Sequence, residues 1–355
     1  MNKKLSDEKL KLLRAGTVIP AHPLALDNNK NLNERYQRAL TRYYIDSGAG
    51  GIAVGVHSTQ FEIRNPEFNL YEPVLKLAAE EIDNFAHVRP ILKIAGVCGP
   101  TEQAVAETDI ATGLGYDMIL LSMGGLGNLS ERDLLKRTAV IAGKMPVFGF
   151  YLQPSVGGRA FSYDFWKNFA EIPNVMAIKT APFNRYYTLD VMRAVCSSTR
   201  RELISVYTGN DDNIVNDLLT TYAFNTDDGY FKKDIVGGLL GHWAVWTQKA
   251  VELLRDIKAH KETGGGIDPV WLTKNIQVTD SNAAFFDPAH QFKGCISGIH
   301  EVLRRQGLME NILCLSDSEI LSPGQSEEID RVYAAYPDLN DDEFVKENLS
   351  KWLAD

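Results

Sequence analysis

The chain has 355 residues, 45% of them apolar, and a formal net charge of −9. This length and composition can bury a large core, and the acidic balance offers no basic surface for nucleic acid or an anionic membrane. Residues 1–16 mix charges with leucines, unlike a signal peptide, and no segment approaches the length of a membrane span. Four cysteines without CxxC spacing indicate reduced core thiols. We therefore expect a soluble, cytoplasmic protein.

Apolar runs alternating with amphipathic segments predict eight strands and the helices between them. The expected strands are residues 16–20, 51–56, 91–97, 118–122, 147–151, 175–179, 203–208 and 235–240. The expected helices are residues 33–47, 74–85, 101–112, 131–143, 162–171, 188–199 and 212–222. Eight such repeats over about 240 residues predict an α/β fold, a (β/α)8 TIM barrel. A doubly wound sheet is the alternative, but the first strand lacks the glycine-rich dinucleotide turn that such a fold would favour.

Further helices are expected after the eighth strand. An amphipathic segment covers residues 243–258, a glycine run follows at 264–266, and two more helix-like stretches occupy 292–308 and 326–353. We therefore expect a barrel with a short N-terminal helix over residues 1–260. Residues 261–355 would form a C-terminal helical region that covers the barrel wall or makes an oligomer contact.

Chemistry in a barrel collects at the carboxyl ends of the strands, so the residues there form the candidate site. They are His22, Val56, His57, Cys98, Gly99, residues 122–125, Tyr151, Lys179, residues 208–211, residues 237–241 and His242. Within the last stretch, Gly238 and Leu239 are expected to contact substrate.

Lys179 closes the apolar run 175–178, which should direct its ammonium into an interior where charge is costly. Burial lowers the pKa of a lysine, and a neutral amine can attack a ketone to form a Schiff base. Tyr151 ends the preceding strand, 28 residues earlier, where a phenol could move protons. The structural alternatives are a snorkelling or ion-paired lysine and a tyrosine that only packs.

These residues carry a family resemblance that spans most of the chain. The segments are GAGGIAVGVHSTQFEIR, YLQP at Tyr151, NVMAIKTA at Lys179, TGNDDN, and FKGCISGIHEVLRRQGL near the C-terminus. Together, in this order and spacing, they resemble the class I aldolase superfamily that contains dihydrodipicolinate synthase and N-acetylneuraminate lyase.

The resemblance implies a lyase whose Lys179 attacks the keto carbon of pyruvate or another 2-keto acid, with Tyr151 shuttling protons. Backbone N–H groups of Val56, His57 and Ser58 would hold the substrate carboxylate. The lysine itself supplies the electron sink, so no cofactor is expected. The resemblance also implies a homo-oligomer, commonly a dimer or tetramer.

Departures from the family pattern bear on the relay and on the substrate. In the family, a threonine hydroxyl at the position of Val56 passes protons together with the strand-five tyrosine, and valine cannot do so. His57 either takes over this proton relay or only packs against its neighbours. No tyrosine follows strand four, and Val156 occupies the slot of a carboxylate-binding arginine, with Arg159 three residues later as a distal contact. We therefore do not expect true dihydrodipicolinate synthase activity, but a lyase, aldolase or dehydratase acting on another 2-keto acid.

Two other functions remain open. A metal-dependent barrel enzyme could bind zinc through His22, His57 and His242, although no characteristic ligand spacing supports it. A non-catalytic protein that only binds a 2-keto acid is the second alternative.

Overall fold

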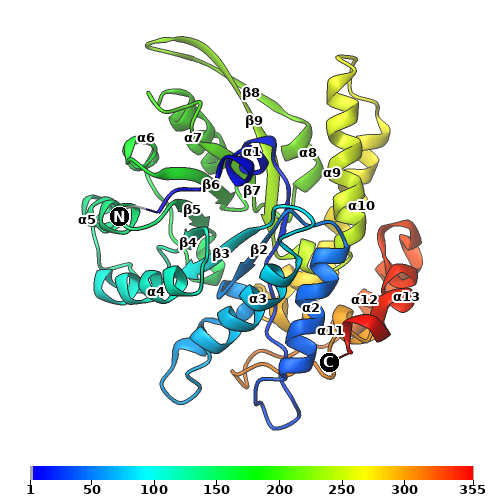
Figure 1. Cartoon of the computed structure of the whole chain (residues 1–355). Coiled ribbons are helices and arrows are strands. Elements are labelled where there is room, and N and C mark those ends of the chain that lie inside the picture. Colours follow the sequence, from blue (N-terminus) through cyan, green and yellow to red (C-terminus); the bar gives the residue numbers. More distant parts are fainter. Residues whose placement is uncertain (1–2, 355) are drawn as a thin grey trace.

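The computed structural model describes residues 3–354. Eight parallel strands form a barrel surrounded by helices (Figure 1). The barrel strands are β1 (Val18–Pro20), β2 (Gly51–Val54), β3 (Leu92–Val97), β4 (Met118–Leu121), β5 (Val147–Leu152), β6 (Val175–Ala181), β7 (Ser205–Thr208) and β9 (Gly229–Leu240). Their order is β1-β9-β7-β6-β5-β4-β3-β2, and a parallel bridge between Ala21 and Ala53 joins the ends of β1 and β2. The predicted (β/α)8 barrel is therefore confirmed.

Helices follow the strands as expected. They are α2 (Glu34–Asp46), α3 (Tyr71–Phe85), α4 (Thr101–Gly113), α5 (Glu131–Ala142), α6 (Tyr163–Glu171), α7 (Arg185–Cys196), α8 (Ile214–Leu219) and α9 (Thr247–Glu262). Asn33, Ser130, Ser162 and Asn184 cap α2, α5, α6 and α7, because each side chain accepts a first-turn N–H that the helix leaves unpaired. A short helix, α1 (Asp7–Ala15), precedes β1.

An antiparallel arm departs from the simple repeat. The sequence predicts a helix over 212–222, but α8 ends at Leu219 and β8 (Thr221–Thr226) pairs with the first half of β9. The pairing runs from Thr221 opposite Asp234 to Thr226 opposite Gly229, and the arm projects from the barrel (Figure 1). The two turn residues Asp227 and Asp228 close this hairpin, and the arm shortens the helix and lengthens the eighth barrel strand.

Four further helices complete the chain: α10 (Val270–Phe286), α11 (Cys295–Arg305), α12 (Gln325–Ala335) and α13 (Asp342–Trp352). The last three lie where helices are expected, whereas α10 was not predicted. α13 is fixed to α2, since Trp352 Nε1 donates to Asp46 at 2.7 Å. Within residues 3–354, no helix has both the length and the apolar character needed to cross a membrane.

Two apolar layers build the core. One fills the barrel, where Phe148 and Phe150 of β5 pack with Leu239 of β9. The other lies between the strands and the surrounding helices, where Val147 and Tyr151 of β5 pack. Successive strand residues point to opposite faces, so each strand contributes side chains to both layers. The interior-facing residues at the carboxyl end of a strand are the ones that can line the site.

Candidate active site

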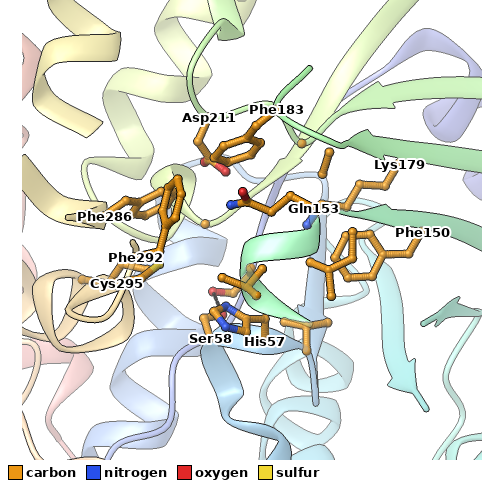
Figure 2. Close-up of a pocket in the computed structure, with 18 residues that line it drawn as sticks. His57, Ser58, Phe150, Gln153, Lys179, Phe183, Asp211, Phe286, Phe292 and Cys295 are labelled. Carbon is orange, nitrogen blue, oxygen red and sulfur yellow. Dashed lines mark hydrogen bonds between the residues drawn. The ribbon is translucent and has the colours of Figure 1, made fainter. Parts of the chain in front are cut away.

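A cavity of about 60 Å³ opens at the carboxyl ends of the barrel strands. At about 30 Å³ per water molecule this volume corresponds to about two waters, which suits a small organic acid. Figure 2 shows its labelled side chains converging from the barrel and from the C-terminal helices. Its wall consists of Ala21, Val56, His57, Ser58, Phe150, Leu152, Gln153, Val156, Lys179, Ala181, Phe183, Gly209, Asp211, Gly241, Phe286, Phe292, Cys295 and Ile299.

Lys179 is the cationic side chain of this cavity. It lies on β6 with 8% of its surface exposed, and its Nζ sits 4.3 Å from the centre of the Phe150 ring. No carboxylate of residues 3–354 lies within 4.0 Å of Nζ, so the ammonium has no ion-pair partner there. Burial lowers the pKa of Lys179 to about 8, and the charge of Asp211 opposes that shift. The ion-paired alternative therefore does not fit, and a substantial neutral amine population is available near pH 8.

Gly209 makes room for the lysine stem. A Cβ at this position would lie 2.4 Å from Lys179 Cε and 2.7 Å from Ala181 Cβ. A side chain at position 209 would therefore push the aliphatic part of Lys179 away from the end of β7.

Asp211 brings a carboxylate to the same cavity. Its Oδ1 accepts the backbone N–H of His242 at 2.9 Å, and only 6% of the residue is exposed. Burial raises the pKa of Asp211 to about 7, against the opposing effects of the His242 hydrogen bond and the Lys179 charge. A carboxyl of this kind is present in both protonation states near neutral pH.

The loop after β2 is held by a threonine. Thr59 Oγ1 accepts the N–H groups of Gly55 and Val56, at 3.0 and 3.1 Å, and donates to the His22 carbonyl at 2.6 Å. The Val56 N–H is therefore occupied, contrary to the expectation that it binds substrate. His57 and Ser58 open the short helical turn η1 (His57–Thr59), where N–H groups have no acceptor within the turn. Both residues line the cavity.

The His57 ring is a neutral group in this wall. Burial, assisted by the positive charge of Lys179, lowers its pKa to about 4. The ring packs edge-on against Phe61 at 5.9 Å. The expected position of His57 beside the lysine is thus observed, with an imidazole that stays uncharged at neutral pH.

Tyr151, by contrast, lies outside the cavity. Its ring is fully buried between the barrel and the helices, 4.9 Å from Trp166 and 5.7 Å from Phe161. The phenol oxygen accepts the backbone N–H of Phe161 at 3.2 Å, and burial raises its pKa to about 12. The prediction that Tyr151 and Lys179 converge is therefore wrong for this structure.

Strand register explains the discrepancy. Phe150 is paired with Lys179 and Tyr151 with Thr180, and residues paired in parallel strands point to the same face. Phe150 therefore shares the barrel interior with Lys179. A register shift next to Val147 sets this pairing, and a one-residue shift exchanges the two faces of a strand.

Three more expected contacts fall elsewhere. Leu239 is fully buried in the barrel interior, and a Cβ on Gly238 would meet the Trp243 ring at 2.6 Å. Gly241, rather than these two, supplies the β9 end of the cavity wall. Arg159 donates to the Leu129 carbonyl at 2.8 Å and covers an aromatic ring, so it does not line the cavity.

The alternative metal site does not form. His22 is bound within its own loop, where its Nε2 lies 2.9 Å from Thr41 Oγ1. His242 stacks on Phe285 at 5.9 Å, and only His57 lines the cavity. Within residues 3–354, no three histidine, cysteine or acidic side chains come together as metal ligands.

A larger hollow of about 580 Å³ adjoins the cavity at the ends of β3, β4 and β5. Leu152 and Val156 line both spaces and so form the partition between them. Arg64 in the hollow is paired with Glu107 at 2.9 Å and donates to two backbone carbonyls. Its charge is therefore already compensated.

Several wall residues were not predicted to belong to the site. Phe286, Phe292 and Cys295 come from the C-terminal region, and the segment between α10 and α11 turns sharply through left-handed residues such as Phe292, at φ 65°. Phe183, also left-handed, meets Phe292 with ring centres 5.8 Å apart. Only spatial folding brings these aromatic side chains to the barrel mouth.

The fold and this cavity define a (β/α)8 barrel protein with a buried lysine at the strand ends. The chain belongs to the dihydrodipicolinate synthetase family, whose model matches residues 14–222. It is 25% identical over 168 residues to the N-acetylneuraminate lyase of Mediterraneibacter gnavus. That match covers 46% of this chain and 51% of the relative, so the chain spans about half the length of this curated relative.

Solved structures agree on the fold. The dihydrodipicolinate synthase of Acinetobacter baumannii, complexed with pyruvate, has a TM-score of 0.71 and 18% identity, covering 90% of this chain and 98% of that one. The N-acetylneuraminate lyase of Mycoplasma synoviae has a TM-score of 0.68 and 14% identity, covering 90% and 98%. At these identities the likeness concerns the architecture.

Proposed function

We propose that the protein is a Schiff-base-forming lyase acting on pyruvate or another 2-keto acid, with Lys179 as the nucleophile. The observation that carries the proposal is the buried, unpaired Lys179 amine whose pKa is lowered to about 8. The neutral amine would attack the keto carbon, and the resulting iminium would accept electrons while a neighbouring C–C or C–O bond forms or breaks. Family membership supports this reaction class.

The substrate carboxylate would bind the loop after β2. The backbone N–H groups of His57 and Ser58 have no acceptor within η1, and both residues line the same cavity as Lys179. Two N–H donors and a nearby amine suit the carboxylate and the ketone of one small 2-keto acid. His57, neutral at pH 7, would contribute a hydrogen bond to the substrate.

The second reactant would have no carboxylate of its own. The cavity wall beyond Lys179 is largely apolar, with Phe183, Phe286 and Phe292. Val156 lines the cavity, whereas the Arg159 guanidinium is bonded to the Leu129 carbonyl outside it. Arg64 in the adjoining hollow is already neutralised by Glu107. An uncompensated second carboxylate would be costly there, so we propose an electrophile or product other than that of dihydrodipicolinate synthase.

A non-catalytic 2-keto acid binding protein is the second candidate, and one observation favours it. The Tyr151 phenol, which the resemblance assigns to proton transfer, faces the helices and not the cavity. Such a protein would form the imine or bind the acid without breaking a bond in it.

Borohydride reduction tests the proposal. Wild-type protein treated with pyruvate and borohydride should gain one reduced adduct by intact mass, and Lys179→Ala should gain none. Lys93→Met is the matched control, because Lys93 is also buried on a barrel strand but is ion-paired with Asp83 at 2.6 Å. It should form the adduct as the wild type does. Absence of any adduct with pyruvate and with larger 2-keto acids would refute the Schiff-base proposal.

A further inference from the structure

The described cavity wall contains one carboxylate, and it has no assigned role. Figure 2 shows the Asp211 side chain directed into the cavity that holds Lys179. Its Oδ1 is occupied by the His242 N–H, and no other residue within 3–354 donates a hydrogen bond to Oδ2. Because the side chain lines the cavity, this oxygen is free to meet a substrate or a proton there.

The proposed chemistry needs such a group. For the iminium to form, the keto oxygen must leave as water after receiving two protons, one of which comes from the Lys179 amine itself. The second proton needs an acid. An enamine then forms when a base removes a proton from C3 and the C–H electron pair moves towards the iminium nitrogen.

The other groups of the wall fit these two steps less well. Ser58 already donates its hydroxyl proton to the Ala21 carbonyl at 2.8 Å. Gln153 does not titrate, and burial holds the pKa of Cys295 well above its usual value. The low pKa of His57 makes it a poor proton donor near neutral pH.

We propose that Asp211 is the acid–base residue of this site, taking the place that the outward-facing Tyr151 leaves empty. This inference rests on the proposed Schiff-base function. The Asp211 carboxylic acid gives its proton to the departing hydroxyl, and the carboxylate so formed accepts the C3 proton. The group thereby returns to its starting state without any external acid or base. Its buried position keeps both protonation states available near neutral pH.

Exchange of the pyruvate methyl protons in D2O tests this assignment without knowledge of the second reactant. The Asp211→Asn variant keeps an oxygen for the His242 N–H but cannot carry the proton. We expect its exchange rate above background to fall by about 10²–10⁴-fold. The matched control is Asp227→Asn, since Asp227 is exposed in the turn between β8 and β9 and lies outside the cavity wall. It should exchange at the wild-type rate.

The outcomes separate the two proposals. If wild-type protein forms no borohydride adduct, the Schiff-base function fails. If wild type forms the adduct and Asp211→Asn exchanges within about threefold of it, the role of Asp211 is refuted. Should Asp211→Asn fail to fold, the pH profile of wild-type exchange and its displacement in Asp211→Glu decide the matter. The assignment would be overturned if the wild-type exchange rate had no inflection near neutral pH, or if Asp211→Glu left that inflection where it is.

Discussion

Substitution of Tyr151 by phenylalanine distinguishes a structural phenol from a catalytic one. The phenol oxygen accepts the Phe161 N–H at 3.2 Å, and Phe161 is itself buried. Removing the oxygen leaves a buried N–H without an acceptor, which should cost about 1–3 kcal/mol of unfolding free energy. The ring keeps its packing against Trp166, so the fold should persist.

Proton exchange into pyruvate and urea unfolding together measure both effects. We expect Tyr151→Phe to exchange within about twofold of wild type while its unfolding midpoint falls. A phenol acting in proton transfer would instead lower the rate by about 10²–10⁴-fold with little change in stability. That second result would refute the placement of Tyr151 between strands and helices.

Three further outcomes follow from the site. The rate of imine trapping should be greatest at about pH 7–8, because it needs both the protonated Asp211 carboxyl, with its pKa raised to about 7, and the neutral Lys179 amine, with its pKa lowered to about 8. A rate that keeps rising to an inflection above about pH 10 in time-resolved mass spectrometry would contradict the burial of Lys179. Gly209→Ala should reduce adduct formation by about tenfold or more, because its Cβ would displace Lys179 Cε; adduct formation at the wild-type rate would show that the lysine stem adjusts freely. Burial lowers the pKa of His22 to about 4, so its neutral form stabilises the fold fully above its ordinary value near 6.5. About 3 kcal/mol should be lost as pH falls from 6.5 to 4, and a urea-unfolding series in which His22→Gln shows the same pH dependence as wild type would contradict this.

The barrel could be predicted from sequence because each strand is a short apolar run between amphipathic helices. All eight predicted strands are present; seven lie within two residues of their expected bounds, and β9 begins six residues earlier than expected. The β8–β9 arm and α10 were missed. The turn residues Asp227 and Asp228, followed by Gly229, are typical of a hairpin, whereas α10 lacks a clear apolar stripe.

The site was predicted in part. The position of Lys179 in the cavity follows from its place at a strand end, and His57 and Ser58 accompany it. The side of the barrel to which Tyr151 points could not be predicted. Every residue of β5 is buried, so the sequence pattern does not show which of them face the barrel interior. A register shift sets the pairing of β5 with β6. The aromatic wall from the C-terminal region depends on contacts between distant parts of the chain.

The central claim is that the Lys179 amine bonds covalently to a 2-keto acid. Peptide mapping of wild-type protein after treatment with pyruvate and borohydride tests this most directly. The account predicts a single reduced adduct, carried by the peptide that contains Lys179. An adduct on any other lysine, or none with pyruvate and larger 2-keto acids while the protein remains folded, would contradict it.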